Sequence, residues 1–323
     1  MQIQLILPAL LAAMLLPAVC WSADDVDIAV STHTYKKVGD LEIKLDLHRP
    51  ADDKIRPVLV WIHGGALING HRASVPGRLS KPLLEAGCAI VSIDYRLAPE
   101  TQLPEIIADL EDAFTWIHKH GREVLHVDPD RLVVAGGSAG GYLTLTAGYR
   151  AKPRPRALVS FWGYGDLVGD WYSKPSPHAR HSSDLSRDEA YRQVSGPPVS
   201  DSRERKGDGG AFYRYCRKQG IWPKAVSGWD PQEEAEKFAP YMPLKNVTAD
   251  YPPTLMIHGT KDTDVPYENS TLMAEQFNRH GVKHELLTID GGEHGLGGGD
   301  PEKINQAYNS AIAFIKRRLG LDY

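Results

Sequence analysis

Short apolar segments alternate with longer amphipathic segments along most of the chain. Residues 41–47 alternate apolar and polar side chains, which predicts a half-buried antiparallel strand. Continuous apolar runs are instead typical of strands that are covered on both faces, as in a parallel sheet. Such runs occupy residues 57–62, 89–93, 132–135, 157–161 and 254–257.

The segments between these runs have helical spacing. Within residues 104–119, for example, Ile106, Leu110 and Phe114 fall on one apolar stripe. The same spacing is found in residues 78–86, 139–149, 267–280 and 302–319. An alternation of strands and helices with right-handed crossovers predicts an α/β fold with a doubly wound, mostly parallel sheet.

One long interval interrupts this alternation. About 90 residues separate the apolar runs that end at Phe161 and begin at Pro253, and they hold four of the seven tryptophans. A connection of this length is unusual in a compact domain. Residues 195–210 are rich in Gly, Pro, Ser and charge, which predicts a mobile loop. A solvated surface insertion is one interpretation, but the aromatic content favours a cap at about residues 163–250.

The first 23 residues contain no charged side chain. Their apolar run, residues 5–19, is interrupted only by Pro8 and Pro17 and is too short to span the ~30 Å core of a bilayer as a helix. It fits the apolar region of a secretory signal peptide, with Cys20 and Ser22 as small residues at a possible cleavage site. We therefore expect a signal peptide at 1–22, one domain at 23–323, export to the periplasm or beyond, and no membrane span in the mature chain.

Charge and cysteine content narrow the class of protein further. The 323 residues include 37 basic and 41 acidic side chains, a net charge of −4, which provides no field for nucleic acid. After removal of a signal peptide, Cys88 and Cys216 would remain, one in a buried strand and one in the insertion, too far apart for a disulfide. No C-x-x-C or zinc spacing is present. We therefore expect neither a metal nor another cofactor.

Chemistry is indicated first by Ser138. It lies in the sequence Gly136-Gly137-Ser138-Ala139-Gly140, which has the pattern G-x-S-x-G between a predicted strand and a predicted helix. In that context the pattern is typical of a nucleophile elbow, a turn too tight for most side chains. A phosphate-binding loop is the alternative, but the spacing and the lysine of a P-loop are missing.

Two further loops could complete a site for nucleophilic catalysis. His63-Gly64-Gly65-Ala66 follows the apolar run 57–62, and its glycines would allow backbone N–H groups to form an oxyanion hole together with Ala139. His294, flanked by glycines, follows a strand-like segment at 286–289 and is a candidate base. An acid that orients the base should lie between serine and histidine in the chain order of this fold, and Asp262 and Asp264 both do.

Five motifs in this order resemble the α/β-hydrolase superfamily, and within it the hormone-sensitive-lipase-type branch of bacterial esterases. They are H-G-G, the segment 94–100 (DYRLAPE), G-G-S-A-G-G, H-G-x-x-D-x-x-V-P and G-x-x-H-G. The resemblance covers about residues 40–320 except the insertion. It implies that Asp262 is the acid and that Gly65 and Ala66 supply the loop donors, although relatives usually have a third glycine at Ala66.

Position relative to the strand also separates the two aspartates. Asp262 comes soon after Ile257, whereas Asp264 directly precedes Val265-Pro266, where the next helix is expected to begin. An aspartate there is well placed to cap a helix, which would occupy the carboxylate of Asp264. For Arg96 and Glu100 we expect structural ion pairs rather than catalytic roles.

The sequence thus predicts a metal-free serine hydrolase that cleaves small-molecule carboxylic esters through an acyl-enzyme, with Ser138 as nucleophile, His294 as base and Asp262 as its orienting acid. A peptidase of the prolyl-oligopeptidase type is one alternative, but the short segment 23–49 cannot supply its large N-terminal propeller. A catalytically silent binding protein of the same fold is another, but such proteins typically lack a member of the triad.

Overall fold

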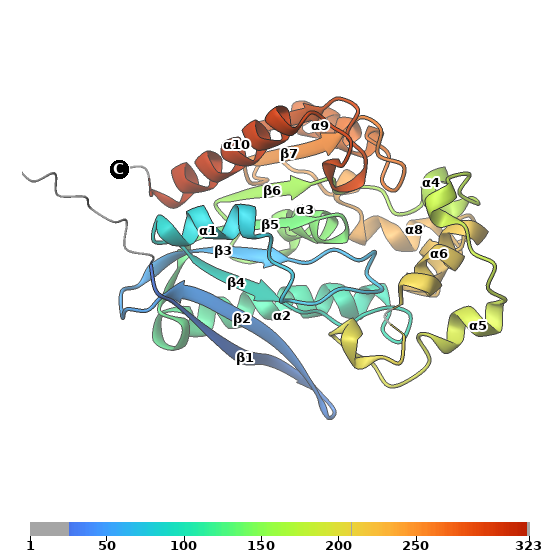
Figure 1. Cartoon of the computed structure of the whole chain (residues 1–323), viewed down its shortest axis with the longest axis horizontal. Coiled ribbons are helices and arrows are strands. Elements are labelled where there is room, and N and C mark those ends of the chain that lie inside the picture. Colours follow the sequence, from blue (N-terminus) through green and yellow to red (C-terminus); the bar gives the residue numbers. More distant parts are fainter. Residues whose placement is uncertain (1–25, 208, 322–323) are drawn as a thin grey trace, which may run out of the picture.

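The strands form one sheet in the order β1-β2-β4-β3-β5-β6-β7-β8 (Figure 1). A computed structural model describes residues 26–207 and 209–321. Only the pairs β1–β2 and β2–β4 are antiparallel. The predicted mostly parallel α/β sheet is therefore confirmed. Its strands are β1 (Ile28–Val38), β2 (Leu41–Pro50), β3 (Arg56–Ile62), β4 (Ala89–Ile93), β5 (Val127–Gly137), β6 (Ala157–Phe161), β7 (Thr254–Gly259) and β8 (His284–Ile289).

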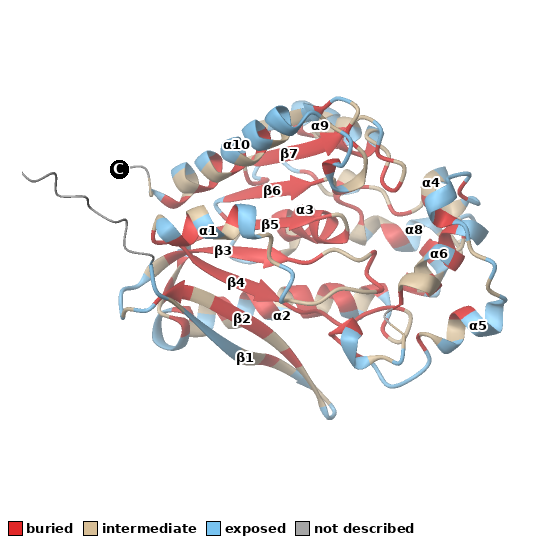
Figure 2. Cartoon of the chain, viewed as in Figure 1, coloured by how far each residue is buried: buried red, intermediate tan, exposed pale blue. Residues whose placement is uncertain are grey.

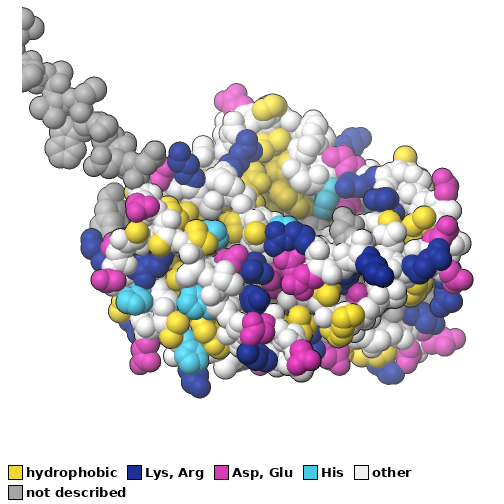
Figure 3. All heavy atoms as spheres, turned by 60° about the horizontal axis from the view of Figure 1, so that its bottom comes forward, with side chains coloured by type: hydrophobic (Ala, Val, Ile, Leu, Met, Phe, Trp, Pro, Cys, Tyr) yellow, Lys and Arg dark blue, Asp and Glu magenta, His cyan; other side chains and the backbone are white. Residues whose placement is uncertain are grey.

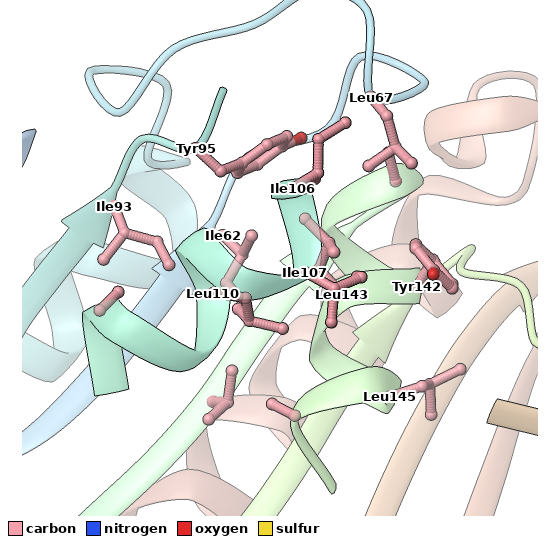
Figure 4. Packing of buried hydrophobic residues seen from close by; sticks show 14 of the residues in the cluster. Ile62, Leu67, Ile93, Tyr95, Ile106, Ile107, Leu110, Tyr142, Leu143 and Leu145 are labelled. Carbon is pink, nitrogen blue, oxygen red and sulfur yellow. The ribbon is translucent and has the colours of Figure 1, made fainter. Parts of the chain in front are cut away.

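Helices cover both faces of the sheet. The side chains of Leu59 and Trp61 pack in a core with α1 and α10, whereas Val58 and Val60 face the core that contains α2, α3 and α9. Figure 2 shows the strands buried between helices whose outer sides are exposed, and Figure 4 shows α2 and α3 packing beside Ile62. These helices are α1 (Gly77–Glu85), α2 (Leu103–His120), α3 (Ala139–Arg150), α9 (Glu268–Arg279) and α10 (Pro301–Leu319).

The long insertion forms short helices rather than further strands. They gather beyond the ends to which the arrows of β3, β4, β6 and β7 point (Figure 1). Its α-helices are α4 (Asp170–Ser173), α5 (Arg187–Arg192), α6 (Gly210–Gln219), α7 (Trp222–Ser227) and α8 (Ala235–Phe238). Shorter 3-10 turns include η2 (Ala179–His181) and η3 (Ser202–Glu204).

Buried ion pairs fix the insertion to the sheet and its loops. Arg205 pairs with Glu100 at 2.5 Å, and their side chains are only 4% and 5% exposed. The amide of Leu97 donates to the carbonyl of Val199 at 2.9 Å. The segment 195–210, predicted to be a mobile loop, is thus anchored at several points. Arg96 pairs with buried Asp109 at 2.7 Å, so the ion pairs expected for Arg96 and Glu100 are both present.

The outer surface carries mixed charge. On the face shown in Figure 3, basic and acidic side chains are interspersed. Within the described ranges, no helix has both the length and the apolar character needed to cross a bilayer. The predicted signal peptide, residues 1–22, lies outside the residues that the structure describes.

Candidate active site

Ser138 occupies a strained turn between β5 and α3. Its backbone angles, a φ of 57° and a ψ of −122°, lie in a region that residues other than glycine rarely adopt. The turn also requires glycine at positions 136 and 140, two residues before and two residues after the serine. A Cβ on Gly136 would lie 2.4 Å from the Gly140 carbonyl oxygen, and a Cβ on Gly140 would lie 2.0 Å from the Ile62 carbonyl oxygen. The strand, the turn and the helix predicted around this serine are therefore all present.

The structure brings Ser138, His294 and Asp262 together in one hydrogen-bonded chain. His294 Nε2 lies 3.0 Å from Ser138 Oγ, and His294 Nδ1 lies 2.8 Å from Asp262 Oδ2. Because Nδ1 faces a carboxylate, we assign the imidazole proton to it, which leaves Nε2 to accept from the serine hydroxyl. This is the arrangement in which an imidazole can remove a proton from a serine.

Asp262 is held by donors on both of its oxygens. Oδ1 accepts the amides of Asp264 and Val265, each at 2.8 Å. Oδ2 also lies 3.2 Å from Nε2 of His258, a buried side chain whose Nδ1 contacts Ser270 Oγ at 2.7 Å. Burial alone would raise the pKa of Asp262, but the hydrogen bonds from His258 and His294 outweigh it and lower the pKa to about 2. Asp262 is therefore charged and fixed in direction.

His258 was not among the predicted site residues. Its only signal in the sequence is its place as the first residue of the H-G-x-x-D motif, four positions before Asp262. At the end of β7 the chain turns back, which brings the imidazole against the carboxylate. His258 therefore positions the acid rather than the serine.

Asp264 does not cap a helix, so this prediction is wrong. Helix α9 begins at Glu268, and its N-cap residue, Tyr267, makes no side-chain cap. Asp264 instead lies against the insertion, and buried side chains of the insertion donate hydrogen bonds to its carboxylate. Its Oδ1 accepts from three side chains of the insertion, namely His181 (2.9 Å), Arg217 (2.7 Å) and Tyr213.

The second oxygen of Asp264 faces the imidazole of His294. Oδ2 lies 3.6 Å from His294 Nε2 and 3.7 Å from Arg180 Nη2. Burial would raise the pKa of Asp264, but the hydrogen bond from His181 and the charges of His294 and Arg217 hold it well below its usual range. His294 is therefore bordered by two ionised carboxylates, one at each ring nitrogen.

The predicted oxyanion loop comes close to Ser138. A Cβ on Gly64 would lie 3.3 Å from Ser138 Cβ. Gly65 (φ 106°) and Ala66 (φ 56°) have left-handed backbones, and their amides donate no hydrogen bond to another residue in the described part of the chain. Ala139 is the first residue of α3. The loop also contacts the insertion, because Trp222 Nε1 donates to the Ala66 carbonyl at 3.0 Å.

His63 fixes the backbone of this loop. Its ring stacks on Tyr95 with centroids 4.3 Å apart, and its Nδ1 lies 2.7 Å from the Gly64 carbonyl oxygen. The Tyr95 hydroxyl donates to the His63 carbonyl at 3.0 Å. Burial lowers the pKa of His63 to about 4, so the ring is neutral at physiological pH.

The described residues contain no group of three or more His, Cys, Asp and Glu side chains arranged to hold a metal ion.

The α/β hydrolases are a class of proteins with a mostly parallel sheet that has a hydrogen-bonded serine, imidazole and carboxylate at the carboxyl ends of its strands. This protein has that sheet and that hydrogen-bonded chain. The model of a family described as alpha/beta hydrolase fold matches residues 59–297, about three quarters of the chain. The chain belongs to this family. The match confirms the resemblance to the hormone-sensitive-lipase-type branch.

Relatives and solved structures agree with this assignment. A non-reducing polyketide synthase of Penicillium rubens is 28% identical over 81% of this chain, but the chain spans only 12% of that relative's length. A truncated carbohydrate esterase from gut microbiota has a TM-score of 0.66 at 20% identity, with 92% of this chain and 99% of that chain covered. Esterase 2 of Thermogutta terrifontis, phosphoramylated by tabun, has a TM-score of 0.61 at 23% identity, with 89% and 94% covered. These likenesses show the fold.

Proposed function

We propose that this protein is a serine hydrolase of carboxylic esters that works through an acyl-enzyme. The hydrogen-bonded chain from Ser138 through His294 to Asp262 is the observation that carries the proposal. It supplies a nucleophile, a base and an orienting acid at hydrogen-bond distances, which is the requirement for acyl transfer to serine.

In the first half of the reaction, His294 Nε2 takes the proton of Ser138 Oγ as the oxygen attacks the ester carbonyl. Asp262 keeps the imidazole in the required tautomer and stabilises its charged form. The amides of Gly65, Ala66 and Ala139 hold the oxyanion of the tetrahedral intermediate, in a role that is commonly worth about 3–4 kcal/mol for one donor. The intermediate collapses as His294 gives its proton to the departing alcohol.

In the second half, water takes the place of the alcohol. His294 removes a proton from the water, which attacks the acyl-enzyme, and then returns a proton to Ser138 Oγ. The carboxylic acid leaves and the free enzyme is restored.

Ester rather than peptide cleavage is supported by the names of two structural neighbours, a carbohydrate esterase and an esterase. We extend the proposal to the insertion, residues 163–250, as a cap that selects substrates, since its helices gather beyond the carboxyl ends of the strands. We also propose that the uncharged residues 1–22 are a signal peptide and that the protein is exported.

The proposal is tested by replacing the nucleophile. Ser138→Ala should reduce hydrolysis of 4-nitrophenyl acetate to below a few per cent of the wild-type kcat and abolish labelling by a fluorophosphonate probe. Ser310→Ala, on the exposed side of α10, serves as the matched serine control and should behave like the wild type.

Each rival function has its own outcome in this experiment. Labelling of the wild type without ester turnover, together with cleavage of aminoacyl amides, would favour a peptidase. No labelling of the folded wild type would favour a silent binding protein. Substantial turnover by Ser138→Ala would place the nucleophile elsewhere.

A further inference from the structure

One oxygen of Asp264 has no role in holding the fold together. The residue is only 7% exposed, and its Oδ1 accepts from three side chains of the insertion. Oδ2, in contrast, accepts no hydrogen bond from any residue that the structure describes. Its nearest ionic neighbours are His294 Nε2 at 3.6 Å and Arg180 Nη2 at 3.7 Å. Because the donors of the insertion occupy Oδ1, Oδ2 is left available to accept a hydrogen bond from a bound substrate.

The position of Oδ2 indicates which part of a substrate it would meet. In the proposed reaction the leaving oxygen must come within about 2.6–3.2 Å of His294 Nε2 to receive its proton. Oδ2 lies 3.6 Å from that same nitrogen. It therefore borders the alcohol side of a bound ester, whereas the oxyanion loop borders the carbonyl oxygen.

The surrounding charges indicate which donor fits. Three carboxylates, Asp262, Asp264 and Glu293, lie near two guanidinium groups. Arg217 contacts Asp264 at 2.7 Å, and Arg180 contacts Glu293 at 2.7 Å while lying 3.7 Å from Asp264. Because Arg217 already pairs with Asp264, a neutral hydroxyl fits this position better than a second cationic group.

We propose that Asp264 determines specificity for the alcohol: its Oδ2 accepts a hydrogen bond from a hydroxyl on the carbon next to the ester-bearing carbon. The preferred substrates are then monoacyl esters of diols and polyols, sugars included. This inference rests on the proposed esterase function and names the substrate class for the same site.

The insertion holds the carboxylate in place for this contact. His181 is itself fixed by Ser176, whose Oγ lies 2.7 Å from its Nδ1. Arg217 is stacked over Tyr172, with the guanidinium carbon 4.8 Å from the ring centroid, and is 2% exposed. An acceptor fixed in this way loses little entropy when a hydroxyl binds, which favours selectivity.

The test compares esters that differ in one group. 2-Hydroxyethyl acetate and propyl acetate have similar size, but only the first can donate to Oδ2. We expect kcat/KM to favour the hydroxy ester about tenfold in the wild-type enzyme, a difference of about 1.4 kcal/mol. 2-Methoxyethyl acetate, which keeps the oxygen but cannot donate, should lose this preference. That comparison needs no variant.

Two variants distinguish the role of Asp264 Oδ2 from that of the side chains that hold Asp264 Oδ1. Asp264→Asn should reduce the ratio of the two kcat/KM values toward one, because the charged acceptor is removed. Tyr213→Phe is the matched control: it removes one donor to Oδ1 but leaves Oδ2 charged, and should keep the ratio.

Four results would overturn the inference. In the wild type, these are an equal kcat/KM for the hydroxy, methoxy and propyl esters, or a preference for acetylcholine over all three of these esters. In the variants, they are an unchanged ratio of kcat/KM for the hydroxy ester to that for the propyl ester in Asp264→Asn, or a loss of this ratio in Tyr213→Phe as large as in Asp264→Asn. A wild-type protein that hydrolyses none of these esters and is not labelled by a fluorophosphonate would instead contradict the proposed function itself.

Discussion

His294 lies between two carboxylates that are held by different parts of the fold. Asp262 is bound by two backbone amides of the loop that follows β7 and by His258, which lies near the end of β7 itself. Asp264 is bound by side chains of the insertion. Only Asp262 lies within hydrogen-bond distance of Nδ1, the nitrogen that must carry the proton while Nε2 receives the one from Ser138. The two residues, close in sequence, are therefore expected to have different effects.

Asp262→Asn should lower kcat for 4-nitrophenyl acetate by about three to four orders of magnitude with little change in thermal stability. The amide can present its NH₂ group to Nδ1, which would favour the tautomer whose Nε2 cannot accept from Ser138. Steady-state kinetics and a thermal melt check both parts. Asp40→Asn, in the exposed turn between β1 and β2, is the control. A variant that keeps a tenth of the wild-type kcat would show that Asp262 is not the orienting acid.

At the scale of elements, strands that are buried on both faces are predicted well from the sequence, whereas an exposed edge strand is not. The continuous apolar runs became β3 to β7, and their predicted bounds differ by few residues from those observed, apart from the longer β5. β1 was missed because it is an edge strand in which a single residue is buried and others, such as Ser31, Thr32 and Lys37, are exposed, so no apolar face marks it. Pairing with β2, not an apolar pattern of its own, makes this segment a strand.

The candidate site follows the same division. Ser138, Asp262 and His294 lie in short loops directly after strands, and such loops have motifs that can be read from the sequence. The partners of Asp264 could not be predicted, because His181 and Arg217 come from two short elements of the insertion, η2 and α6, and lie 83 and 47 positions away in the chain. Their meeting depends on tertiary packing, which no local pattern encodes.

The anchor of the insertion can be tested at Arg205. Glu100 is buried beside it, and burial already raises the pKa of this carboxyl despite the ion pair. Arg205→Ala would leave the charge unpaired, which typically costs about 3–5 kcal/mol in the free energy of unfolding. Lys81→Ala removes an exposed pair with Glu85 at 3.9 Å and should cost less than about 1 kcal/mol.

The pH dependence of this loss has a definite sign. Without Arg205, the folded-state pKa of Glu100 rises further above its unfolded value, so protonation favours the folded state. The free energy of unfolding is therefore little affected below the unfolded-state pKa of Glu100, where the carboxyl is protonated in both states. It falls as pH rises toward the folded-state pKa, because the buried carboxyl must then either keep its proton or become an unpaired charge. Denaturant unfolding should therefore show a larger loss at pH 8 than at pH 5. An equal loss at both values would mean that Glu100 does not carry the effect.

At the scale of the whole molecule, the insertion and the sheet share one hydrophobic core. Phe212, Trp222 and Phe238 of the insertion belong to the same buried cluster as Ile62 of β3 and Tyr142 of α3. Trp222 also donates to the oxyanion loop. An insertion built into the core in this way should unfold with the sheet rather than before it.

Cys88 and Cys216 can show whether the insertion unfolds with the sheet. Both are fully buried, and both are free, as the sequence predicts. Burial raises the pKa of Cys88 to about 12 and that of Cys216 well above its usual value, so neither reacts until the chain opens. Cys88 precedes β4, whereas Cys216 lies on α6 beside Arg217, and α6 cannot leave without breaking the buried pair with Asp264.

We therefore expect both thiols to become reactive together as denaturant is increased. Pulse labelling with a maleimide, followed by peptide mass spectrometry, measures each cysteine separately. The two midpoints should coincide with each other and with the loss of near-UV circular dichroism. In Arg217→Ala, where the tie to Asp264 is missing, Cys216 should react at lower denaturant than Cys88. Early reaction of Cys216 in the wild type would instead show that the insertion opens as a separate unit.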